Sequence, residues 1–117
     1  MTSRAHTPSD PSSSADVVVV GRLGSRVDVR ELPSGDTITV FTIVVDRTRS
    51  AGRPASTVKV DAIACQAFRA TVVNRLERLE PGQWVRAEGS LRRRFWRSGG
   101  GLGSAMEVEV SRLSAVA

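Results

Sequence analysis

The sequence predicts an all-β fold with one helix, in the order β-β-β-α-β-β. Short segments of alternating apolar and polar residues fill most of the 117-residue chain, and such alternation is typical of half-buried strands. Only the segment 65–79 repeats its apolar residues at helical spacing. Clusters of glycine, proline and serine separate the segments, as expected for turns.

The size and charge of the chain limit the class of protein. Its 117 residues suffice for one domain, and 40% of them are hydrophobic. The formal net charge of +5 favours a polyanionic partner but does not determine the fold. We expect residues 1–16 to be a disordered N-terminal arm, because they lack apolar periodicity. We expect residues 17–117 to form the domain.

The sequence argues against an enzyme, a metal site and a membrane protein. Cys65 is the only cysteine and His6 the only histidine, which leaves no disulfide within the chain and no Cys/His metal cluster. No carboxylate pairs with a histidine, and no G-x-x-x-x-G-K-[ST] loop is present. No apolar run approaches the roughly 20 residues that span a bilayer. We therefore expect a non-enzymatic protein without cofactors, in the cytoplasm and associated with the nucleoid.

The first half of the domain predicts a long hairpin. The β-branched run 17–20 is typical of a strand buried on both faces, and in a small protein one of those faces is often a subunit contact. Gly21 and Gly24 allow a bulge. The turn Pro33-Ser34-Gly35-Asp36 leads into a second strand at 37–47.

A basic loop at 48–56 follows the second strand. Its cations and those beside it suit a finger that contacts a phosphate backbone; they are Arg47, Arg49, Arg53 and Lys59. Loops are also polar and arginine-rich without any ligand, so both interpretations stay open.

A third strand at 57–64 and the helix at 65–79 come next. The apolar stripe of the helix should face the core; it consists of Phe68, Val72, Leu76 and Leu79. Pro81-Gly82 ends the helix. We expect Cys65 to be a small buried residue, because no histidine is available to activate its thiolate.

The segment 84–97 predicts the fourth strand and the main binding surface. One face should fit a core; it carries Val85, Ala87, Gly89, Leu91, Arg93 and Phe95. The other face ends in Arg92, Arg94 and Trp96. A flat ring beside guanidinium groups suits nucleobases stacked above a phosphate chain. The alternative is that Trp96 covers an edge of the core and that the arginines are merely solvated.

Residues 98–103 predict a flexible hairpin loop, and residues 105–113 predict the last strand. Met106, Val108 and Val110 should face inward, and Glu107 and Glu109 outward. Five short strands with one helix between the third and fourth match the five-stranded OB barrel. This fold binds oligonucleotides or oligosaccharides, so the fold alone does not decide the function.

Three motifs resemble those of the bacterial single-stranded DNA-binding proteins (SSB). They are V-V-V-V-G-R-L-G at 17–24, V-R-E-L-P-S-G at 29–35 and P-G-Q-W-V-R-A-E-G-S-L-R-R-R-F-W at 81–96. The resemblance implies sequence-independent binding of single-stranded DNA in replication, recombination or repair, by a basic surface with few stacking aromatics. It also implies a homotetramer that assembles through the first strand, at Val17, Val18, Val19 and Val20.

The resemblance implies a set of DNA-binding residues. Trp96 matches the stacking tryptophan of the family's fourth strand, and Arg30 matches a basic hairpin position. With the other cations near the expected path, the full set is Arg30, Arg47, Arg49, Arg53, Lys59, Arg92, Arg94, Trp96 and Arg97.

Departures from the family motivate a second hypothesis. The family's other aromatic positions fall on Arg49, near Val58 and near Ala64 or Cys65, although arginine can also stack. The family's acidic-tipped tail, which recruits other enzymes, is not found in the sequence, which ends at Ala117. The chain is either an SSB with few aromatics or an accessory subunit that assembles with a full-length paralogue and binds DNA weakly or not at all. The same surface suits RNA, because nothing in the sequence identifies a reader of the 2′-hydroxyl.

Overall fold

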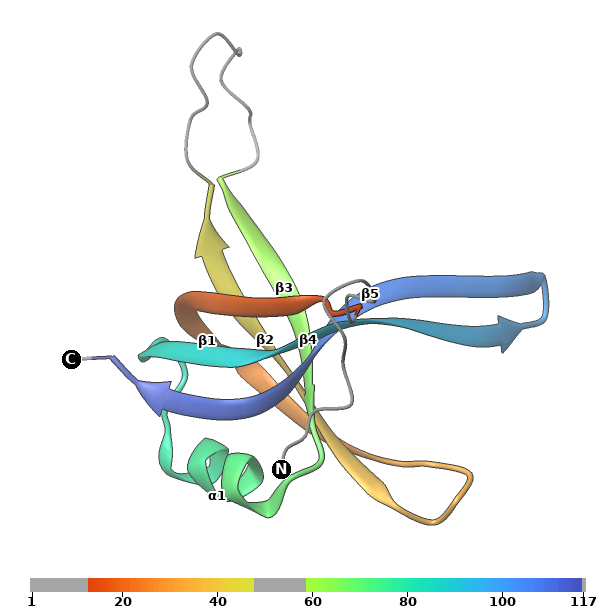
Figure 1. Cartoon of the computed structure of the whole chain (residues 1–117), viewed down its shortest axis with the longest axis horizontal. Coiled ribbons are helices and arrows are strands. Elements are labelled where there is room, and N and C mark those ends of the chain that lie inside the picture. The colour runs from red at the N-terminus through yellow and green to blue at the C-terminus, as the bar shows by residue number, and fades with distance from the viewer. Residues whose placement is uncertain (1–12, 48–58, 117) are drawn as a thin grey trace, which may run out of the picture.

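The computed structural model describes residues 13–47 and 59–116, which form a five-stranded barrel with one helix (Figure 1). The elements are β1 Asp16–Glu31, β2 Thr37–Asp46, β3 Val60–Ala67, α1 Ala70–Arg78, β4 Trp84–Ser98 and β5 Gly101–Ala115. The sheet closes in the order β1-β2-β3-β5-β4. Neighbouring strands are antiparallel except β3 and β5, which run parallel. This is the OB barrel that the sequence predicts.

The core fills the barrel and the space below it. Ile43, Val85 and Val110 come from three different strands and are almost completely buried. Val72 and Leu76 add the apolar side of α1, which lies across one end of the barrel (Figure 1). Each such side chain stabilises the fold by about 1.5–3 kcal/mol when it leaves water. Within the described ranges, no helix has the length and apolarity needed to cross a membrane.

The boundary between β3 and α1 differs from the prediction. β3 continues to Ala67, and α1 begins only at Ala70. Residues 65–67 pair with β2 and are buried in the sheet, so tertiary packing overrides their weak helical signal. Phe68 therefore stands between the two elements, where its side chain is 46% exposed. Its assignment to the buried stripe of the helix was wrong, whereas those of Val72 and Leu76 are confirmed.

β4 and β5 continue past the barrel as a two-stranded extension, residues 92–107, which we call the arm (Figure 1). Its ladder runs out to Ser98 paired with Gly101. The prediction of a loop over 98–103 was therefore wrong, because only Gly99 and Gly100 turn the chain. Phe95 and Met106 were expected to face the core. Their side chains are 59% and 43% exposed, because the barrel ends before the strands do.

We expect Gly89→Ala to lower the free energy of unfolding by roughly 1–3 kcal/mol, the usual effect of overpacking. A Cβ at Gly89 would overlap the carbonyl oxygen of Glu109 and lie 3.0 Å from Cα of Val110. Both atoms belong to the paired backbone of β5, which cannot move aside without loss of the ladder. Gly99→Ala is the matched control, because a Cβ there meets nothing within 4 Å. Urea unfolding measures both variants, and equal stabilities would contradict this account.

Candidate nucleic-acid interface

One face of the arm carries an aromatic ring and two arginines. Arg92, Arg94 and Trp96 alternate along β4 and so lie on the same face, as the sequence predicts. We call this the Trp96 face. β5 places Gly103 opposite Trp96, and a Cβ at that glycine would come within 2.6 Å of the indole. The absence of a side chain at Gly103 thus lets the ring lie against the neighbouring strand, with 39% of Trp96 exposed.

Both arginines of the Trp96 face pair with carboxylates of β5. Nε of Arg92 donates to Oε1 of Glu109 at 3.1 Å. Nε of Arg94 donates to Oε2 of Glu107 at 3.0 Å, and the same guanidinium lies over the ring of Trp96, 5.1 Å from its centroid. A phosphate that binds either arginine must share or displace the carboxylate.

Glu107 is the buried member of this group. The sequence predicts an outward side chain, but only 8% of it is exposed, and it lines a pocket together with Cys65 and Arg30 from neighbouring strands. Its Oε1 is buried and has no hydrogen-bond partner among the described residues. Burial, together with the charge of Glu107, raises the pKa of Cys65 to about 12. Cys65 is therefore a buried neutral thiol, as expected, and not a nucleophile.

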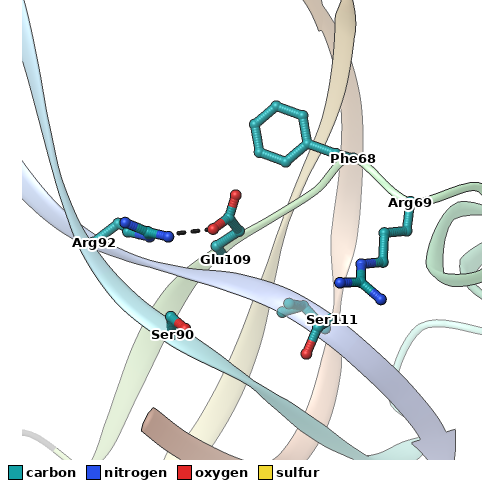
Figure 2. Close-up of a pocket in the computed structure, with 7 residues that line it drawn as sticks. Phe68, Arg69, Ser90, Arg92, Glu109 and Ser111 are labelled. Carbon is teal, nitrogen blue, oxygen red and sulfur yellow. Dashed lines mark hydrogen bonds and ion pairs between the residues drawn. The ribbon is translucent and has the colours of Figure 1, made fainter. Parts of the chain in front are cut away.

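A pocket of about 570 Å³ adjoins the Trp96 face (Figure 2). It is lined by Phe68, Arg69, Ser90, Arg92, Glu109, Val110 and Ser111. Figure 2 shows the ring of Phe68 extending toward the carboxylate of Glu109, and the ion pair of Arg92 with Glu109 lies across from the side chain of Arg69. The pocket thus connects a second exposed ring to the charged surface of the arm.

Phe68 is the residue of this surface that was not predicted from the sequence. The predicted third strand, 57–64, has no aromatic residue at its end. Because β3 extends to Ala67, Phe68 occupies that place. The preceding run Ala64-Cys65-Gln66-Ala67 has no apolar period that separates a strand from a helix, so the sequence contains no signal that would have placed the ring.

Three of the other predicted contacts, Arg30, Arg47 and Lys59, belong to two further hairpins (Figure 1). Arg30, near the end of β1, lines a smaller pocket of about 200 Å³ together with Arg26 and Asp28. Arg47 follows β2, and its Nε donates to Oδ1 of Asp61 at 3.0 Å. The backbone amide of Arg47 donates to the carbonyl oxygen of Lys59 at 2.9 Å, so these two cations are neighbours.

Three predicted contacts remain, namely Arg49, Arg53 and Arg97. Arg49 and Arg53 lie outside the described residues. Arg97 pairs across the arm with Leu102, while Trp96 pairs with Gly103, so Arg97 lies on the opposite face. The residues that the structure brings together are thus Arg92, Arg94 and Trp96, with Phe68 beside them.

A closed OB barrel with exposed rings and arginines on one projecting hairpin defines a class of protein, the OB-fold nucleic-acid-binding proteins. The particular family follows from comparison with known proteins. The chain belongs to the single-strand binding protein family, whose family model matches residues 15–116. The members of this family are binding proteins, which confirms the expectation that the chain is not an enzyme.

The chain was also compared with solved structures and with curated proteins. The solved structure of a Plasmodium falciparum SSB in complex with ssDNA is similar to this chain, with 21% sequence identity and a TM-score of 0.74. The alignment covers 92% of this chain and 98% of the other. This likeness supports the fold. Among curated proteins, the comparison finds none that matches.

We expect Glu109→Gln to strengthen binding of a single-stranded oligonucleotide by about two- to fivefold, the equivalent of one exposed ion pair. The change removes the carboxylate that occupies Arg92 and leaves that guanidinium free for a phosphate. Anisotropy of a labelled oligo-dT at low salt measures the affinity. Glu77→Gln is the control, because it makes the same charge change on α1. If the two variants bind alike, the ion pair does not compete with the ligand.

Proposed function

We propose that this chain binds single-stranded DNA without regard to base sequence. The proposed path runs from the pocket beside Phe68, along Arg92 and Arg94, to Trp96. The observation that carries the proposal is the exposed indole set among arginines on the arm of a barrel that belongs to the single-strand binding family. Rings accept any base as a stacking partner and guanidinium groups bind any phosphate, so neither reads a sequence.

Stacking would supply much of the affinity. Each base stacked on Phe68 or Trp96 would contribute roughly 1–3 kcal/mol. The arginines would contribute less than their number suggests, because Glu107 and Glu109 already compensate two of them. An accessory subunit that does not bind DNA is not favoured, since both rings are exposed and the family match spans nearly all of the described chain.

The remaining predicted cations would add phosphate contacts; Arg97 would do so from the opposite face of the arm, and the others are Arg30, Arg47, Arg49, Arg53 and Lys59. The cellular role that we propose is to cover single strands exposed in replication, recombination or repair, in the cytoplasm and at the nucleoid. Release of counterions from the bound phosphates would make the affinity fall steeply as salt rises.

We also propose that the chain assembles into a homotetramer through β1, with a full-length paralogue as the alternative partner. Val17 and Val19 pack against the core, whereas Val18 and Val20 are 54% and 44% exposed on the outer face of β1. The single chain therefore buries one face of this strand. An exposed row of valines favours aggregation unless a partner covers it, and the same strand of a second copy offers a matching surface.

The first test of the function is a titration with oligo-dT that follows tryptophan fluorescence at low and moderate salt. We expect quenching that weakens at the higher salt. Trp96→Ala should lower the affinity roughly 5- to 150-fold, which corresponds to one stacked base. Trp84→Phe is the control, because Trp84 lies at the start of β4 in the barrel, beside Arg22. No quenching by the unmodified chain at low salt would refute the function.

The second test addresses assembly. Val20→Asp should shift the mass observed by native mass spectrometry from the oligomer to smaller species, because it places a charge in the proposed apolar contact. Val29→Asp makes the same change on the far half of β1, where the valine is 69% exposed, and should leave the mass unchanged. If Val20→Asp retains the assembly of the unmodified chain, the β1 contact is wrong.

A further inference from the structure

The arm has a second face with the same combination of side chains. The β4–β5 register pairs Arg93 with Met106, Phe95 with Ser104 and Arg97 with Leu102. These residues therefore share the side of the arm opposite Trp96, and we call this side the Phe95 face. It sets one phenylalanine between two arginines, and the phenylalanine is 59% exposed, more than the 39% of Trp96.

The two faces of the arm differ in charge. On the Trp96 face, Glu107 and Glu109 compensate both arginines. On the Phe95 face, Nη1 of Arg93 donates to Oγ of Ser104 at 3.2 Å. In the part of the chain that the structure describes, no carboxylate pairs with Arg93 or Arg97. The Phe95 face therefore carries the uncompensated positive charge of the arm.

The Phe95 face is also the continuation of the barrel's inner surface. Leu91 lies opposite the buried Val108, so the same side of the sheet runs from the core onto the arm. Past the barrel, this side leaves Leu102 69% and Met106 43% exposed. Exposed apolar surface of this kind marks an interaction site. Guanidinium groups on both sides of the ring favour a partner that combines phosphates with flat apolar groups.

We propose that the Phe95 face is a second contact surface for the same single-stranded nucleic acid. One base stacks on Phe95, and Arg93 and Arg97 bind the phosphates on either side of it. The inference rests on the proposed function, because the strand held on the Trp96 face passes around the arm to reach this side. At the tip, Gly99 and Gly100 present no side chain to obstruct that passage, and even a Cβ at either position would meet nothing within 4 Å.

A fluorescence experiment tests the stack directly. The chain is prepared with Phe95→Trp, Trp84→Phe and Trp96→Phe, so that position 95 carries the only indole. Oligo-dT long enough to pass both faces should quench this indole at low salt. If the triple variant still binds the same oligonucleotide by anisotropy and the indole at position 95 keeps its fluorescence, the second contact is wrong while the proposed function stands. If the unmodified chain does not bind, both fail together.

Affinity measurements distinguish nucleic acid from a protein partner. Phe95→Leu keeps an apolar side chain but removes the ring, and should weaken binding of the long oligonucleotide roughly 5- to 150-fold. An altered oligomeric mass in this variant, with unchanged DNA affinity, would assign the face to a second copy of the chain and overturn the proposal.

The arginines are tested through the salt dependence. Arg93→Gln combined with Arg97→Gln should make the slope of log affinity against log salt shallower by about 1.4, or about 0.7 for each lost phosphate contact on single-stranded DNA. Arg75→Gln combined with Arg78→Gln is the matched control, because it removes the same charge from the last turn of α1. Equal slopes for the two double variants would overturn the proposal.

Discussion

The pairing of β1 with two different strands is the constraint on which the rest of the structure depends. Its first half pairs with β4 and its second half with β2, and Arg22 belongs to both ladders. The bulge between Leu23 and Val27 redirects the strand between them. Closure removes the free edges of the sheet within the barrel. Strand length that the barrel does not use therefore projects as hairpins, and the proposed binding surface lies on one of these.

Most of the correct predictions came from the alternation of apolar and polar residues along single strands. It placed Val85 and Ala87 in the core and aligned Arg92 with Arg94 and Trp96, because both results depend only on the two-residue period of one strand. It could not show where the barrel ends, and so Phe95 was wrongly assigned to the core. The point at which the barrel ends depends on closure of the sheet, and closure involves residues far apart in the sequence.

The ion pairs of Glu107 and Glu109 on the proposed binding surface could not be predicted from the sequence for a related reason. Which glutamate meets which arginine depends on the register of β4 against β5, and this register is set by a tight turn in a glycine-rich segment that reads as a loop. Because these ion pairs already neutralise Arg92 and Arg94, stacking would contribute more than charge to the binding of nucleic acid on the Trp96 face. Bases within a duplex are already stacked and cannot offer their faces to a ring, so this balance favours unpaired strands.

Burial of Cys65 also determines how the protein responds to oxidants. Peroxides attack the thiolate, and with a pKa of about 12 this thiol is almost entirely protonated at neutral pH. The exposed sulfur-containing residue that the structure describes is instead Met106, on the arm. Oxidative damage would therefore convert the thioether of Met106, on the Phe95 face of the arm, into a polar sulfoxide sooner than it would oxidise Cys65.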